Sequence, residues 1–167
     1  MVVVADTSPL NYLVLIGEID VLPQLYGRVL VPNAVVDELR HSAAPERVAE
    51  FAKSLPDWLQ LGPAEPGDLS IAWAGMNHLD PGEVAAIMLA SSHPGALLLM
   101  DETAGRSEAA RRGIRSTGTL GILRDAAASG LVDLPSAFQK LQATTFRLPP
   151  AVLIELLEQD AKRKEHL

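Results

Sequence analysis

Short apolar runs alternate with longer segments of helical periodicity along the chain. The apolar runs predict strands at residues 2–5, 28–31, 96–100 and 114–117, with a short edge strand at 58–61. The longer segments predict helices at residues 9–16, 19–25, 33–40, 46–54, 81–92, 103–112, 119–129, 135–143 and 150–164. Residues 62–67 are rich in proline and glycine and predict a loop. Apolar strands that alternate with helices predict an α/β fold with a mostly parallel sheet covered on both faces, and the pattern leaves the strand order open.

Two aspartates directly follow predicted strands. Asp6 comes after the run at 2–5, and Asp101 comes after the run at 96–100. Ser8 followed by Pro9 predicts the start of the first helix, with Ser8 as the N-cap. Asp6 is then left without a capping role. Because open α/β sheets bind ligands at the carboxyl ends of their strands, the two acids suggest a metal site.

Two glutamates on predicted helices extend this hypothesis, and every acid except Asp6 also has a purely structural explanation. Glu38 fits a solvated helix face. Glu83 fits a capping box with Asp80 as the N-cap. Asp101 fits an N-cap for the helix that starts near Glu102. Carboxylates that converge at one sheet edge repel one another, and hard cations such as Mg²⁺ or Mn²⁺ relieve that repulsion.

Composition limits the alternatives. The 167 residues are 48% hydrophobic and 21% charged, which fits one soluble domain. The absence of cysteine excludes disulfides, thiolate zinc sites and a cysteine nucleophile. A net charge of −7 argues against a generic nucleic-acid coat, although not against an enzyme that holds cations. We expect a cytoplasmic protein without a membrane span, because no apolar run approaches about 20 residues and no secretory signal is evident.

A locally basic stretch follows Asp101. It contains four arginines with one glutamate among them: Arg106, Arg111, Arg112 and Arg115, with Glu108. One interpretation is contact with a phosphate backbone, which needs no base specificity. The other is a solvated helix face whose charges pair with one another. The sequence slightly favours the second.

Five segments occur in the order typical of one known family. They are Asp6-Thr7-Ser8-Pro9-Leu10; Val31-Pro32 leading into Val36-Asp37-Glu38-Leu39; Leu79-Asp80-Pro81-Gly82-Glu83-Val84-Ala85-Ala86-Ile87; Leu98-Leu99-Met100-Asp101-Glu102; and Gly118-Thr119-Leu120-Gly121-Ile122-Leu123. In these segments the chain resembles the PIN-domain ribonucleases, in particular the VapC-like toxin branch. The resemblance covers roughly residues 2–147 and implies a PIN-like nuclease domain at 1–147, with residues 148–167 as a C-terminal helical extension.

The resemblance implies a three-layer α/β/α sandwich whose acids form one metal site. It carries catalysis and metal binding onto Asp6, Glu38, Glu83 and Asp101, with Mg²⁺ or Mn²⁺ as cofactor. Supporting roles fall on Ser8, Asp80, Glu102 and Thr119, and whether Asp80 or Glu83 faces the metal stays open. The implied function is a metal-dependent endoribonuclease with RNA as substrate. The implied partners are a small antitoxin protein and a second copy of the chain.

Other classes of protein that gather acids at strand ends fit less well. A receiver domain is expected to place a lysine near a late strand, and no lysine lies between Lys53 and Lys140. A phosphatase with a nucleophilic aspartate is expected to carry a second acid two residues after Asp6, where Ser8 stands. The remaining alternative is a catalytically inactive PIN-like module that binds other proteins.

Overall fold

The chain folds around a fully parallel sheet. The computed structural model describes residues 1–63 and 75–167, so part of the predicted loop at 62–67 lies outside the described residues. The strands are β1 Val3–Ala5, β2 Val29–Val31, β3 Leu59–Leu61, β4 Leu97–Leu99 and β5 Arg115–Thr117. Their order is β3-β2-β1-β4-β5. The five predicted strands are confirmed, and the order that the sequence pattern left open places β1 at the centre.

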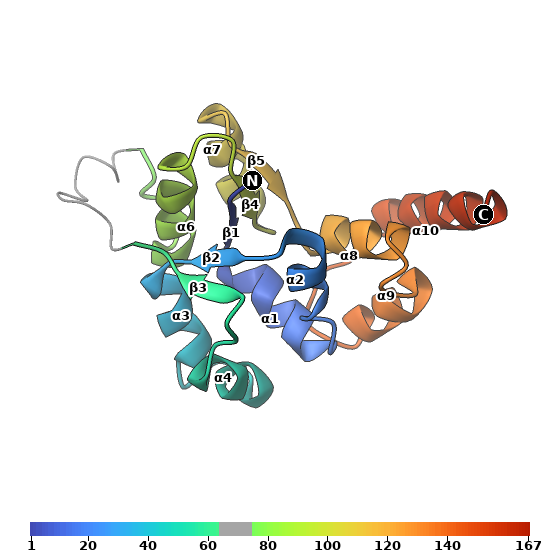
Figure 1. The fold of residues 1–167 in the computed structure, drawn as a ribbon, viewed down its shortest axis with the longest axis horizontal. Coiled ribbons are helices and arrows are strands. Elements are labelled where there is room, and N and C mark those ends of the chain that lie inside the picture. The colour runs from blue at the N-terminus through green and yellow to red at the C-terminus, as the bar shows by residue number, and fades with distance from the viewer. Residues whose placement is uncertain (64–74) are drawn as a thin grey trace.

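Helices cover both faces of this sheet (Figure 1). The described helices are α1 Thr7–Leu15, α2 Val21–Tyr26, α3 Asn33–Arg40, α4 Glu46–Lys53, α6 Pro81–Ser91, α7 Thr103–Arg111, α8 Thr119–Ala128, α9 Leu134–Gln142 and α10 Pro150–Glu165. Each predicted helix is present, and no end is shifted by more than two residues. The predicted three-layer α/β/α sandwich is confirmed.

Alternation along the strands divides the apolar core between the two faces. Val3 and Ala5 point into a cluster that α1, α3, α8 and α9 share, whereas Val4 points into a second cluster with α6. Leu98 joins Val4 in the second cluster, and its neighbour Leu99 lies in the first. Successive side chains of a strand point to opposite faces, so three-residue strands are long enough to serve two cores.

The strand order reverses at β1. The chain passes from β1 to β2 and β3 on one side and later returns to β4 and β5 on the other. Ala5 is in register with Leu99, and the Asp6 backbone N–H donates to the Leu99 carbonyl at 2.9 Å. A parallel sheet leaves a crevice at such a switch point, outside the carboxyl ends of the strands. Asp6 and Asp101 both lie there.

The first helix begins two residues earlier than predicted, which corrects the role given to Ser8. Thr7 is its first residue, and Asp6 takes the N-cap position with extended backbone angles. The Asp6 side chain makes no capping hydrogen bond, so a carboxylate stands where a cap is usual without acting as one. Pro9 is the third helical residue and is buried. Ser8 is therefore free of the capping role, and the original reason for singling out Asp6 was wrong.

The C-terminal helix α10 packs on α8 and α9 through Leu153, Leu156 and Leu157. It extends to one side of the molecule in Figure 1. Asp160 is buried on this helix, where Arg163 and Lys164 bind it at 2.7 and 2.9 Å. The predicted boundary between residues 147 and 148 stays a prediction. Helix α10 lies beyond it and packs against the same core as the residues before it.

Candidate metal centre at the sheet edge

Asp6 is almost fully enclosed. Asp6 is only 3% exposed, and its Oδ1 has no hydrogen-bond partner among the described residues. Burial raises the pKa of Asp6 to about 8, and the Thr7 backbone N–H offsets this only in part. The negative charges of Asp80, Glu83 and Glu38 are smaller contributions to the same rise. An unpaired buried carboxylate surrounded by other acids destabilises the folded chain, and such groups are typical of functional sites.

Glu38 is aimed at the same edge from α3. Its Oε2 accepts a short hydrogen bond from the Thr7 hydroxyl, and its Oε1 accepts from the Gly82 backbone N–H at 3.1 Å. A Cβ atom on residue 82 would lie 2.5 Å from Glu38 Oε1, so only glycine leaves room for the carboxylate. The alternative of a purely solvated helix face is wrong, because both carboxylate oxygens are held by distant parts of the chain.

Asp80 and Glu83 form the capping box that the sequence predicts. The Glu83 backbone N–H donates to Asp80 Oδ1 at 2.8 Å, and the Asp80 backbone N–H donates to Glu83 Oε2 at 2.9 Å. Glu83 is buried and Asp80 is exposed. Burial raises the pKa of Glu83, and the charges of Asp80, Glu102 and Glu38 add to this effect. Both acids act electrostatically on Asp6, so the choice between them stays open.

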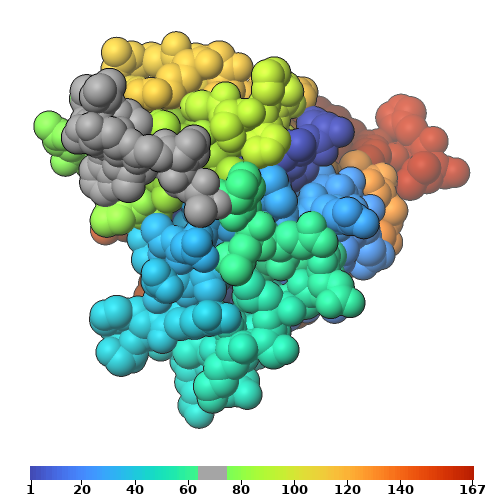
Figure 2. All heavy atoms as spheres, turned by 60° about the vertical axis from the view of Figure 1, so that its left-hand side comes forward, coloured from blue at the N-terminus to red at the C-terminus, as the bar shows by residue number. Residues whose placement is uncertain are grey.

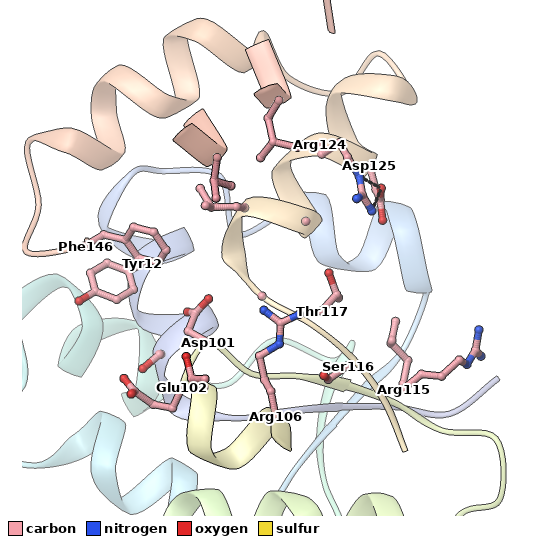
Figure 3. A pocket seen from close by; sticks show the side chains of 18 of the residues that line it. Tyr12, Asp101, Glu102, Arg106, Arg115, Ser116, Thr117, Arg124, Asp125 and Phe146 are labelled. Carbon is pink, nitrogen blue, oxygen red and sulfur yellow. Dashed lines mark hydrogen bonds and ion pairs between the residues drawn. The ribbon is translucent and has the colours of Figure 1, made fainter. Parts of the chain in front are cut away.

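Asp101 is fixed by the start of α8. Its Oδ1 accepts from the Thr119 backbone N–H at 2.7 Å, and its Oδ2 accepts from the Thr119 hydroxyl at 2.8 Å. Burial nevertheless raises the pKa of Asp101. The predicted cap of its own helix is wrong: Glu102 takes the N-cap position of α7, without a side-chain bond. Glu102 is exposed beside Asp101, as Figure 3 shows.

Sequence reasoning missed three residues that shape this edge. Thr7 binds Glu38, Gly82 makes room for Glu38, and Gly118 makes room for Asp101. A Cβ atom on residue 118 would lie 2.7 Å from Asp101 Oδ1. The adjacent sequence offered a weak signal for Thr7, a hydroxyl directly after Asp6. The two glycines carry no such signal, because their partners are 44 residues away in one case and 17 in the other.

In the described residues, the acids are not arranged as a preformed set of metal ligands. Within residues 1–63 and 75–167, no three acidic or histidine side chains stand close enough together to hold one ion. Their chemistry nevertheless fits a hard divalent cation: oxygen donors, raised pKa values, and a buried Asp6 oxygen without a partner. Each carboxylate oxygen of Glu38 and Asp101 accepts a hydrogen bond, and a carboxylate offers about four lone-pair sites, so both acids retain acceptor capacity for an ion.

Two pockets flank the acids. A large one, of about 1330 Å³, begins at Ser8, Asp101 and Glu102 and contains several arginines (Figure 3). A smaller one, of about 560 Å³, begins at Thr7 and Glu38 and continues between α3 and α4. Those two helices form the cyan to turquoise lobe of Figure 2. The acidic edge therefore lies between two cavities that differ in charge.

Comparison with known proteins identifies the family. The family model for the PIN domain matches residues 2–162, and the chain therefore belongs to the PIN-domain family. No curated protein and no solved structure matched the chain. PIN domains are generally nucleases that use divalent metals and bind RNA, so the family indicates a nuclease-type hydrolase. Among the described residues, no helix is long and apolar enough to cross a membrane.

Proposed function

We propose that the protein is a metal-dependent endoribonuclease of the VapC-like branch, which hydrolyses RNA phosphodiester bonds at the edge formed by β1 and β4. The observation that carries this proposal is Asp6, a buried acid with an unpaired oxygen at the topological switch point of the sheet. Nothing in the described fold requires an acid there. A hydrophobic or amide side chain would be cheaper to bury, because it carries no charge to desolvate.

Asp6, Glu38, Glu83 and Asp101 would hold Mg²⁺ or Mn²⁺, with Asp80 as the alternative to Glu83. When bound, such an ion supplies a water of lowered pKa and stabilises the charge on the leaving oxygen. Asp6 must give up its proton to bind the ion. Glu38 and Asp101 are held in place by Thr7, Gly82 and Thr119, so their carboxylates lose little freedom on binding.

Cleavage of a mixed-sequence RNA panel with and without Mn²⁺ tests the activity. We expect the parent to cleave only with the metal, and Asp6→Asn and Asp101→Asn each to lose most of the activity. Asp160→Asn, a buried acid on α10 away from the sheet edge, is the matched control and should cleave like the parent. If Asp6→Asn and Asp101→Asn cleave as well as the parent, the catalytic proposal fails.

Metal binding can be measured without cleavage. A ligand that binds only the folded state raises the melting temperature. We expect Mn²⁺ to raise it for the parent and not for the Asp6→Asn, Asp101→Asn double variant. An equal rise in both proteins would place the ion elsewhere. Metal binding without cleavage would favour the inactive interaction module.

The antitoxin and the homodimer rest on the resemblance to the VapC-like branch. A toxin of this kind should arrest growth when it is expressed alone, and Asp6→Asn should relieve the arrest. Light scattering on the purified chain measures its oligomeric state, and a mass equal to one chain would contradict the homodimer.

A further inference from the structure

The large pocket follows the open edge of the sheet. β5 is an edge strand, and the pocket extends along it from Gly118 and Thr117 beside Asp101 to Arg115 at its other end. Val152 and Leu156 of α10 contribute to the opposite wall. The pocket therefore starts beside the proposed cleavage site and continues along β5.

Four arginines line this space, and Arg124 is the one that pairs with an acid among the described residues, with Asp125 at 2.8 Å. Arg106, Arg115 and Arg147 form no ion pair with any residue in the described part of the chain. Among the described residues, the Arg115 guanidinium makes one hydrogen-bond contact, with Met1 Sδ at 3.3 Å. In contrast, Arg111 and Arg112 point to Glu108, at 3.0 and 2.7 Å. The basic stretch of the sequence thus divides into a paired half and a half that faces the pocket.

Aromatic rings lie at the same pocket. Tyr12 and Phe146 both line it and form an edge-to-face pair, with ring centroids 4.9 Å apart and planes at 87° (Figure 3). Both residues are only half-buried. Aromatic faces near cationic side chains are how proteins hold unpaired bases and their phosphates, because a base can stack only when it has left its own duplex.

The large pocket combines arginines with Asp101, Glu102 and Asp125, whereas the pocket on the other side of the acids differs in charge. It is lined by Asp37, Glu38 and His41 together with neutral side chains, and no lysine or arginine lines it in the described residues. Arg40 and Arg47 of the neighbouring helices donate to the backbone carbonyls of Ala52 and Leu15. A phosphate chain entering here would meet acids without a compensating cation.

Given the proposed function, we infer that single-stranded RNA is held on one side of the cleaved bond only. The nucleotides on that side lie along β5, with Arg106 and Arg115 on their phosphates and Tyr12 or Phe146 against a base. The nucleotides on the other side, toward α3 and α4, contribute little to binding. The charge difference between the two pockets carries this inference, since phosphate contacts dominate the affinity of such complexes.

Shortened substrates test the asymmetry. An RNA with one mapped cleavage position is trimmed stepwise from its 5′ end or from its 3′ end, and KM is measured with Mn²⁺. We expect trimming from one end to raise KM about tenfold per lost phosphate contact at roughly 50 mM salt, and trimming from the other end to leave KM unchanged. Equal losses from both ends, or no loss from either, would overturn the inference while leaving the proposed activity intact.

Binding measurements separate this inference from the activity. Anisotropy of a labelled single-stranded RNA is followed without divalent metal for the parent, Arg106→Gln and Arg115→Gln. Arg28→Gln is the matched control, because Arg28 is an exposed arginine that lines neither pocket. We expect each pocket variant to lower the slope of log affinity against log salt by about 0.7, and the control to leave it unchanged.

Each result of the binding experiment has one meaning. If no RNA is cleaved but the two pocket variants reduce the salt slope, the proposed activity fails and the RNA-binding pocket stands. If the pocket variants bind like Arg28→Gln, the inference is overturned. It is also overturned if an RNA duplex or an acidic peptide competes as well as the single strand, because the pocket would then serve another partner.

Discussion

Buried acids occur at the sheet edge and on the helices α7 and α10, and in the described residues only the acids on these helices form ion pairs. At the sheet edge, Asp6 is buried with an unpaired oxygen among other acids, and its pKa is raised to about 8. On α7 and α10, Glu108 and Asp160 are also largely shielded from solvent, at 6% exposed, yet each binds two cationic side chains. Hydrogen bonding from Arg112 lowers the pKa of Glu108.

Asp160 shows what pairing achieves against burial. Burial alone would raise its pKa, but the hydrogen bonds from Arg163 and Lys164 lower it. Among the described residues, cationic side chains therefore neutralise the buried carboxylate of Asp160, and none neutralises that of Asp6. Selection for stability alone would be expected to pair the buried acids with cations in both regions, because an unpaired buried charge is costly. The difference supports the proposal that the acid at the sheet edge binds a ligand.

The largest expected effect separates the two regions by activity and stability together. Asp6→Asn removes a proposed metal ligand, and the loss of several kcal/mol of transition-state stabilisation corresponds to about a thousandfold fall in cleavage rate. The same change removes a buried charge, so the metal-free variant should melt at a higher temperature than the parent at pH 8. Calorimetry beside the cleavage assay measures both. A variant that loses activity and also melts lower would make Asp6 a structural residue.

The pH dependence sharpens the comparison. The pKa of Asp6 rises from 3.8 to about 8 on folding, so folded Asp6 binds its proton in a range where the unfolded chain has lost it. Its contribution to stability is complete below pH 3.8 and is lost as the pH rises through about 8. Stability of the metal-free parent relative to Asp6→Asn should fall across this window. Denaturant titrations at several pH values test the sign.

Metal affinity should change in the opposite direction. Binding must displace the Asp6 proton, so Mn²⁺ affinity of the parent should rise about tenfold per pH unit below the raised pKa. Isothermal titration calorimetry in buffers of different ionisation enthalpy counts the released protons. An affinity that is flat between pH 6 and about 8 would mean that Asp6 is already ionised, contrary to its raised pKa.

Two glycines provide a smaller, steric test. An added Cβ would lie 2.5 Å from Glu38 Oε1 at Gly82 and 2.5 Å from Leu89 Cδ2 at Gly62. The two clashes are equally close, but only one of them moves a carboxylate. We expect Gly82→Ala to reduce the cleavage rate about tenfold, which corresponds to about 1.36 kcal/mol in activation free energy. Gly62→Ala should lower the melting temperature and leave cleavage unchanged, and equal activity losses would remove Glu38 from the site.

The smallest effect is expected in the paired region. Asp160→Asn breaks an ion-pair cluster whose cationic partners are partly exposed, and it should cost on the order of 1–2 kcal/mol of stability at pH 7, without a change in cleavage. Its folded pKa lies below 3.8, so the contribution is present above that pH and disappears as the pH falls through the folded value. Urea unfolding at neutral and acid pH measures it. A destabilisation that persists in acid would show that pairing is not its source.

Much of the fold follows from local patterns in the sequence. Apolar runs predicted the strands, because a strand buried on both faces of a parallel sheet is apolar along its whole length. Helical periodicity predicted the helices, because it repeats within one or two turns of the chain. The capping box at Asp80 and Glu83 was predictable for the same reason, since its hydrogen bonds join residues three apart. Asp6 was singled out with an incorrect reason: helix α1 starts at Thr7, and Ser8 does not cap it.

The contacts that define the site are long-range, and the sequence pattern does not contain them. Thr7 binding to Glu38, Gly82 beneath Glu38, and Thr119 on Asp101 depend on the strand order, which was not derivable. The division of the basic stretch is of the same kind. Arg111 and Arg112 pair with a residue one helical turn away, whereas Arg106 and Arg115 face a pocket built largely by other segments.

The central claim is that the unpaired acid at the sheet edge exists for a divalent metal that supports RNA cleavage. The most direct measurement is the rate of Mn²⁺-dependent cleavage of the RNA panel by the parent, Asp6→Asn and Asp160→Asn under identical conditions. The account predicts cleavage by the parent and Asp160→Asn and a loss of about a thousandfold in Asp6→Asn. Equal cleavage by the parent and Asp6→Asn, or none by a parent that binds Mn²⁺, would contradict it.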